Sequence, residues 1–174
     1  VKSATARNIP VISDEIYHGL SYGKNVHSAL EYSDSAYVVG SFSKYFAMTG
    51  WRAGWLVAPR DKIRRIERLA ANLFICAPHA SQRLAELALN HDKELKEKVN
   101  IYQRNRELLM ESLPEIGFTK ICPPDGAFYI YCDVSELAEN SKKLCDNLFE
   151  TTGIALTPGN DFDTKRGKKY IRLS

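Results

Sequence analysis

Short apolar runs alternate with amphipathic stretches along the first half of the chain. Residues 9–13, 37–41 and 54–58 are brief and apolar, which predicts strands, and we expect the first two to be buried on both faces. Between residues 61 and 73, apolar side chains recur at helical spacing and basic side chains line the opposite face. This pattern predicts an amphipathic helix, and Pro78 marks the start of another.

The second half has a different order of elements. A long amphipathic helix is expected over residues 92–113, and after Pro114 the pattern changes to short strands around one further helix. We expect those strands at residues 117–122, 127–133, 154–157 and 169–173, and the helix at residues 140–151. Strands and helices in this order indicate a small α+β domain. We therefore divide the chain into domains 1–91 and 92–174, with the boundary near His91.

Composition and charge exclude several classes of protein. Hydrophobic residues make up 44% of the 174 residues and the formal net charge is +3, so neither nucleic acid nor a membrane is expected as a partner. The apolar runs are shorter than the ~20 residues of a membrane-spanning helix. The 4 cysteines are irregularly spaced and the 4 histidines are dispersed, which predicts a reduced, cytoplasmic protein without a metal site.

The two ends of the sequence lie within predicted structure. The chain starts with helix-like residues and stops at Ser174 inside an apparent strand. Domains usually begin and end in exposed polar segments, so we expect this chain to be a fragment of a longer protein.

A lysine follows the second predicted strand, in the segment SFSKYFAMTGWR. A lysine at the end of a buried strand can lose its proton and attack an aldehyde, so Lys44 is a candidate nucleophile. Ser41, Ser43 and Arg52 offer the hydroxyl and guanidinium donors that hold a phosphate. The alternative is a surface lysine beside a serine-rich loop.

Two further polar side chains follow the first predicted strand. In open α/β sheets, ligands bind at the carboxyl ends of the strands. At that position Asp14 can keep a heterocyclic nitrogen protonated, and Tyr17 can hydrogen-bond a ring oxygen. The alternative is that Asp14 caps a helix while Tyr17 packs on the core.

An arginine lies within the last predicted strand, among apolar residues. A buried arginine needs an anionic partner, and its planar fork suits a carboxylate. Arg172 is thus a candidate for binding a substrate carboxylate, with a structural salt bridge as the alternative.

Together these motifs resemble the fold-type I pyridoxal-phosphate enzymes, and most closely the class I and II aminotransferases. The resemblance rests on SxSKxxxxTGWRxG with DExY before it, on PPDGAFY followed by DVS, and on TPG followed by Phe162. The motifs occur in the family's order and extend over essentially the whole chain. The resemblance implies an α/β fold, in which 1–91 is the C-terminal portion of the cofactor-binding large domain, with a mixed, mostly parallel sheet. Residues 92–174 would form the smaller α+β domain.

The resemblance also implies roles for the matching residues. Lys44 would form the internal aldimine with pyridoxal 5′-phosphate and then shuttle a proton. Asp14 would pair with the pyridinium nitrogen, and Tyr17 would hydrogen-bond the ring oxygen. The phosphate would be bound by Ser41 and Arg52, with Ser43 as a weaker candidate.

The implied reaction is ping-pong transfer of an amino group from an L-amino acid to a 2-oxo acid, with Arg172 holding the substrate carboxylate. Family members are longer than this chain and work as homodimers, and their upstream half carries a phosphate loop at a helix N-terminus. We therefore expect this chain alone to be inactive. The alternatives are a C–S lyase of the same fold, an aminotransferase-like effector domain of a transcription regulator, and a degraded coding sequence.

Overall fold

The computed structural model describes residues 1–174, which form two compact units, Val1–Val99 and Asn100–Ser174. The division falls within the longest helix, α4 (Asp92–Glu115). The predicted domain boundary near His91 stays a prediction, because a division into compact units does not show which segments fold independently. None of the helices is both long and apolar enough to pass through a membrane.

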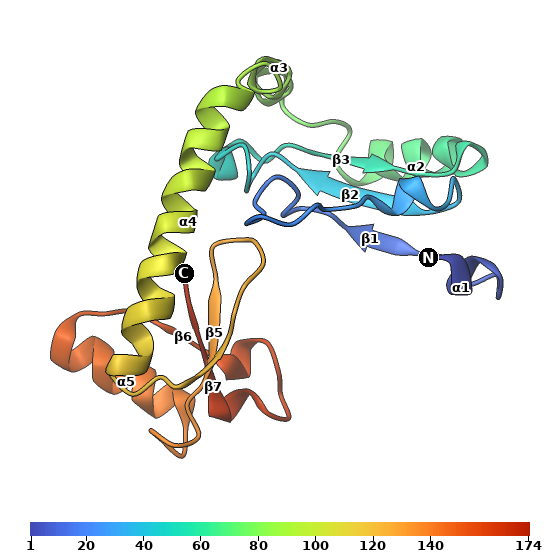
Figure 1. Cartoon of the computed structure of the whole chain (residues 1–174). Helices are drawn as coiled ribbons and strands as arrows, with labels where there is room; N and C mark the ends of the chain where they lie inside the picture. The colour runs from blue at the N-terminus through green and yellow to red at the C-terminus, as the bar shows by residue number, and fades with distance from the viewer. The chain divides into compact units, whose positions relative to one another are not determined.

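The first unit contains a three-stranded sheet. Its order is β1 (Ile12–Asp14), β2 (Tyr37–Ser41) and β3 (Gly54–Val57). β1 pairs with β2 in parallel and β3 pairs with β2 antiparallel, so the sheet is mixed, as expected (Figure 1). In a parallel pair the carboxyl ends of both strands lie at the same edge, and this places the polar residues that follow them close together.

The expectation that the first two strands are buried on both faces is wrong. Ile12 of β1 is 73% exposed, and Ile9, which precedes the strand, is exposed as well. β2 buries Val38 and Gly40 but leaves Val39 exposed, so it is buried on one face only. Apolar, β-branched residues indicate a strand, whereas its burial depends on which neighbours cover the sheet.

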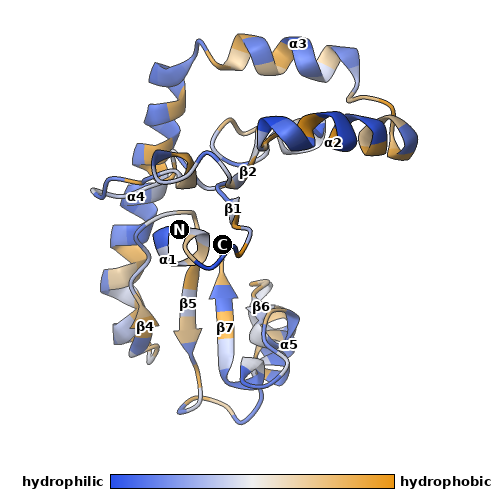
Figure 2. Ribbon diagram, turned by 90° about the vertical axis from the view of Figure 1, so that its right-hand side faces the viewer, coloured by the Kyte–Doolittle hydropathy of each residue, from blue (hydrophilic) through white to orange (hydrophobic).

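The helices of the first unit form where the sequence predicts them. They are a short α1 (Lys2–Thr5), α2 (Arg60–Leu73), α3 (His79–Ala88) and the first part of α4, with 3-10 turns η1 (Ala29–Glu31) and η2 (Thr49–Trp51). Pro78 directly precedes α3, where a proline removes no hydrogen bond of the helix. α2 is amphipathic, with hydrophilic and hydrophobic residues interspersed along it, and its apolar residues Leu69 and Leu73 are exposed (Figure 2).

The second unit combines a four-stranded antiparallel sheet with one helix of its own and the C-terminal part of α4, whose Leu113 belongs to its core. The strand order is β4 (Lys120–Cys122), β5 (Ile130–Asp133), β7 (Tyr170–Leu173) and β6 (Thr157–Pro158), and the helix is α5 (Ser141–Thr152). α5 lies next to β6 and β7 (Figure 2). The core between helix and sheet includes the fully buried Cys132, Val134 and Ile171. This is the α+β arrangement that the sequence predicts. The strand bounds differ: β6 begins only at the last residue of the predicted strand 154–157, and β4 and β5 each start three residues later than predicted.

Two glycines allow the 3-10 turns η3 (Gly159–Asp161) and η4 (Gly167–Lys169) to touch backbone to backbone. A Cβ atom on Gly167 would lie 2.3 Å from the carbonyl oxygen of Gly159, and one on Gly159 would lie 2.6 Å from that of Gly167. The buried hydroxyl of Ser141 donates to the same Gly167 oxygen at 3.0 Å. These contacts join α5 to both turns ahead of β7.

We expect Gly167→Ala to lower the free energy of unfolding by about 3 kcal/mol, the upper end of typical overpacking costs, because the added methyl meets backbone that cannot turn aside. Gly50→Ala is the matched control, since a Cβ there meets nothing within 4 Å. Urea denaturation of both variants measures the difference. Equal stability of Gly167→Ala and the wild type would contradict this packing.

Candidate active site

One edge of the first unit's sheet gathers several of the predicted site residues. Asp14 ends β1 and Ser41 ends β2, and because these strands are parallel, both residues lie at the same edge. β3 runs the other way and starts at Gly54, which pairs with Ser41. Arg52, just before β3, therefore lies at this edge too, and Lys44 lies in the loop that joins β2 to β3.

Hydrogen bonds give this loop its shape. The hydroxyl of Ser41 accepts from the N–H of Ser43 at 3.0 Å and donates to the carbonyl oxygen of Ala53 at 3.3 Å. The hydroxyl of Thr49 donates to the carbonyl oxygen of Ser43 at 2.8 Å. Through these hydrogen bonds, Ser41 and Ser43 stabilise the loop that carries Lys44.

Arg52 adopts a left-handed backbone conformation, with φ at +52°. For a non-glycine residue this costs about 1 kcal/mol, and such strain is concentrated at ligand-binding segments. The Nη1 atom of Arg52 donates to the carbonyl oxygen of Thr49 at 2.9 Å. A guanidinium has five N–H donors, so this bond orients the side chain while others can serve an anion.

Asp14 and Tyr17 occupy different surroundings at the end of β1. Asp14 is exposed, and its Oδ1 accepts from the N–H of Ile16 at 3.2 Å, a local turn contact. A carboxylate can accept several hydrogen bonds, so this contact leaves the side chain able to bind a further donor. The ring centroid of Tyr17 is 5.8 Å from Nζ of Lys44. The fold thus brings Tyr17 next to Lys44 from a different loop.

Glu15, the residue after Asp14, has a structural role that sequence reasoning missed. Its side chain is nearly buried and accepts from the N–H of Ala29 at 2.8 Å and the hydroxyl of Ser28 at 3.1 Å. Burial by itself would raise the pKa of Glu15, but these hydrogen bonds outweigh it and hold the pKa below its usual value. Glu15 therefore anchors η1 to the segment that carries Asp14.

Tyr45, the residue after Lys44, also has a structural role that the sequence did not indicate. Its ring packs against Gly19, where φ is +90° and a Cβ would lie 2.6 Å from a ring carbon. Its hydroxyl donates to Oδ1 of Asp92, the first residue of α4, at 2.8 Å. Tyr45 thus joins the lysine loop, the turn after Tyr17 and the start of α4. The glycine that follows DEIYH is the one signal in the sequence that could have indicated this packing.

Arg172 lies in the second unit, in the interior strand β7, opposite Tyr131 of β5 and Thr157 of β6. Its guanidinium carbon is 4.3 Å from the ring centroid of Tyr129 and 4.4 Å from that of Phe162. Its Nε is buried and has no hydrogen-bond partner. A buried guanidinium nitrogen of this kind is costly unless an anion or another acceptor satisfies it.

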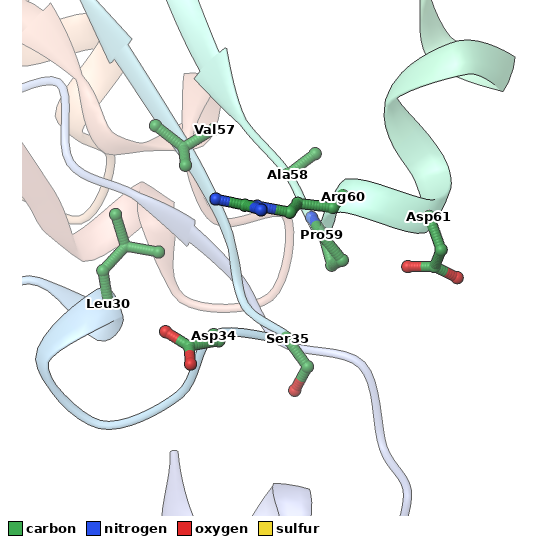
Figure 3. A pocket seen from close by; sticks show the side chains of 8 residues that line it. All are labelled: Leu30, Asp34, Ser35, Val57, Ala58, Pro59, Arg60 and Asp61. Atoms are coloured by element: carbon green, nitrogen blue, oxygen red, sulfur yellow. The ribbon is translucent and has the colours of Figure 1, made fainter.

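A surface pocket in the first unit involves none of these residues. Figure 3 shows Arg60, the first residue of α2, extending toward Val57 and Leu30, while Asp61 points away. The remaining lining residues are Asp34, Ser35, Ala58 and Pro59. Its lining carries side chains of both charges, the positively charged Arg60 and the negatively charged Asp34 and Asp61. The chemistry at the sheet edge, rather than the shape of this pocket, therefore defines the candidate site.

Comparison with known proteins identifies sequence relatives over the whole chain. The profile of the family described as aminotransferase class I and II matches residues 1–174. The valine–pyruvate aminotransferase of Mycobacterium tuberculosis is 43% identical over 173 residues, covering 97% of this chain and 45% of that protein. The (5-formylfuran-3-yl)methyl phosphate transaminase of Methanocaldococcus jannaschii is 36% identical over 173 residues, covering 96% of this chain and 45% of that protein.

Solved structures share the fold. An aminotransferase from Mycobacterium tuberculosis superposes with a TM-score of 0.95 at 42% identity, covering 99% of this chain and 46% of that one. The aspartate aminotransferase of Thermotoga maritima superposes with a TM-score of 0.89 at 30% identity, covering 100% and 45%. These matches confirm the expected fold. The chain spans a little under half the length of the relatives it matches.

The link between Tyr45 and Asp92 predicts a pH dependence of stability. Burial, followed by the hydrogen bond to Asp92, raises the pKa of Tyr45 from 10.0 to about 12. The folded protein thus holds this proton more tightly than the unfolded chain does. The resulting stability is fully present below about pH 10 and is lost as the pH rises through about 12.

Thermal unfolding between about pH 8 and pH 12 tests this prediction. The Tm of the wild type should exceed that of Tyr45→Phe near neutral pH, and the gap should close as the pH rises. Tyr32→Phe, at an exposed tyrosine, controls for the loss of a phenol. A gap between wild type and Tyr45→Phe that stays constant with pH would show that the hydroxyl does not contribute in this way.

Proposed function

The chain belongs to the class I and II aminotransferases, and from this premise we propose that the whole protein is a pyridoxal 5′-phosphate-dependent transaminase. The proposed reaction moves an amino group from an L-amino acid to a 2-oxo acid. The relatives named above carry the names of different substrates, which supports this substrate class and no single amino acid.

One observation carries the proposal: an amine, a carboxylate and a guanidinium share one edge of the sheet. Lys44 follows β2, Asp14 ends β1, and Arg52 precedes β3. Single occurrences of these groups are common on protein surfaces. Their convergence from three strands supports a site for a ligand that has an aldehyde, a basic ring nitrogen and a phosphate.

The residues present fit such a cofactor chemically. The amine of Lys44 suits the aldehyde, and the carboxylate of Asp14 can accept a hydrogen bond from a protonated ring nitrogen. Arg52 suits the phosphate, since one of its N–H groups bonds within the loop and others can donate to an anion. The hydroxyls of Ser41 and Ser43 lie in the same loop and would add donors.

When bound, the cofactor would supply an electron sink for the carbanion that forms at the substrate α-carbon. Lys44 would attach the cofactor and later move a proton at Nζ between two carbon positions. Asp14 would keep the ring nitrogen protonated. Tyr17, whose ring centroid is 5.8 Å from Nζ of Lys44, would hydrogen-bond the ring oxygen.

Arg172 would hold the carboxylate of the substrate in this scheme. Its buried Nε without a hydrogen-bond partner and its planar fork both favour a bidentate anion. By holding both carboxylate oxygens, Arg172 would fix the orientation of that group of the substrate.

We also propose that the whole protein works as a homodimer in the cytoplasm. The four cysteines are free, and Cys132 and Cys145 are buried thiols, which suits a reducing compartment. Burial raises the pKa of Cys132 to about 11, so this thiol stays protonated and unreactive at neutral pH.

The role of Lys44 can be tested by trapping the cofactor on the full-length protein. Incubation with pyridoxal 5′-phosphate followed by borohydride should leave one cofactor per chain bound as a secondary amine, which adds the cofactor mass less one oxygen, and peptide mapping should locate it at Lys44. Lys44→Ala should lose this adduct and lower kcat for transamination at least about 100-fold. Lys62→Ala, on the exposed surface of α2, is the matched control and should retain both.

The two readouts separate the parts of the proposal. An adduct at another lysine would contradict the assignment of Lys44. A Lys44→Ala variant that retains wild-type kcat with every amino acid in a panel of acidic, aromatic and aliphatic substrates would contradict the proposed function itself.

A further inference from the structure

The surroundings of Arg172 contain a second feature besides its buried nitrogen. The guanidinium carbon lies 4.3 Å from the ring centroid of Tyr129 and 4.4 Å from that of Phe162. Both distances are well inside the ~6 Å range of cation–π attraction. Two aromatic rings from separate segments, one before β5 and one after η3, therefore pack against one charged group.

An aromatic ring holds an arginine in a different way from a carboxylate. It attracts the positive charge through the electron density of its face, and the in-plane N–H groups remain donors. A carboxylate partner would instead neutralise the charge and occupy the fork. Packing against Tyr129 and Phe162 thus restrains the rotation of the Arg172 head group without competing with an anionic ligand.

The backbone that carries these residues is itself well restrained. Arg172 lies in an interior strand, paired on both sides. The N–H of Phe162 donates to the carbonyl oxygen of Gly159 at 2.9 Å, in the turn that packs closely against Gly167. Tyr129 directly precedes the buried Ile130 of β5. The relative positions of the two rings and the guanidinium are therefore set within the second unit alone.

Burial of apolar surface does not explain why a phenylalanine occupies position 162, because Phe162 is 51% exposed. A phenylalanine that served only to fill the core would be enclosed by other apolar groups. Contact with the guanidinium of Arg172 is the specific interaction that its ring makes.

We propose that Tyr129 and Phe162 form an aromatic clamp that positions Arg172 for the substrate carboxylate. This inference rests on the proposed function and assigns two positioning residues for substrate binding. The clamp acts through Arg172, and it favours a ligand whose two oxygens lie in the plane of the guanidinium. It contributes to binding of the carboxylate rather than to the proton transfer at Lys44.

The test uses the full-length holoenzyme with Phe162→Leu, Tyr129→Leu and Tyr129→Phe. The matched control is Phe149→Leu, at a phenylalanine on α5 that is 59% exposed. Steady-state kinetics give KM and kcat for L-alanine, L-aspartate and L-phenylalanine, and calorimetry gives the Kd of butyrate, succinate and 3-phenylpropionate. The corresponding amides, which lack the anionic oxygen pair, control for contacts to the rest of the ligand.

We expect each leucine variant to raise KM and the carboxylate Kd about five- to tenfold, as loss of a cation–π contact predicts. The value of kcat, the absorbance of the bound cofactor and the Tm should stay close to those of the wild type. Tyr129→Phe should behave like the wild type, since it keeps the ring. Replacement of Phe162 by phenylalanine analogues with an increasing number of ring fluorines withdraws electron density from the ring face. The carboxylate Kd should rise with each added fluorine.

Each outcome decides one of the two proposals. Unchanged KM and Kd in both leucine variants, or a fluorination series without a trend, would overturn the clamp. A wild type that binds carboxylates but transfers no amino group would refute the proposed function, and the clamp would then be judged by Kd. A wild type that binds none of the carboxylates would overturn the clamp as well.

Discussion

The pairing of β1 and β3 on the two sides of β2 is the constraint on which the first unit's chemistry depends. Because β1 is parallel to β2, Asp14 and Ser41 end at one edge, and because β3 is antiparallel, Arg52 returns to that edge before β3 begins. A different strand direction would move one of these side chains to the opposite end of the sheet. The proposed cofactor site is therefore a consequence of topology before it is a consequence of any individual side chain.

Several residues without a proposed chemical role support this arrangement. Glu15 connects η1 to the end of β1 through partly buried hydrogen bonds, and Tyr45 connects the lysine loop to Gly19 and Asp92. Such contacts limit how far Lys44 can move from its neighbours. Positioning of this kind matters because a shift of about 1 Å in a reacting group can cost a factor of about 100 in rate.

In the second unit, aromatic rings rather than an ion pair contact the partly buried guanidinium of Arg172. Arg172 contacts two aromatic rings, and its Nε has no hydrogen-bond partner, so the guanidinium is held in place while remaining a donor to an anion. A structural salt bridge, the alternative suggested by the sequence, would have satisfied the charge internally. The observed surroundings restrain the side chain without neutralising it, which is consistent with the carboxylate-binding role that we propose.

The sequence by itself determined the element order, the α+β character of the second unit and the identity of the candidate residues, because periodicity and short motifs are local properties of the chain. It did not determine burial: Ile12 belongs to a predicted strand and is nevertheless exposed, because burial depends on what covers the sheet. Only the tertiary structure revealed the contacts of Tyr45 with Asp92 and of Phe162 with Arg172. These pairs join segments that are distant along the chain, and local pattern contains no information about which distant partners meet.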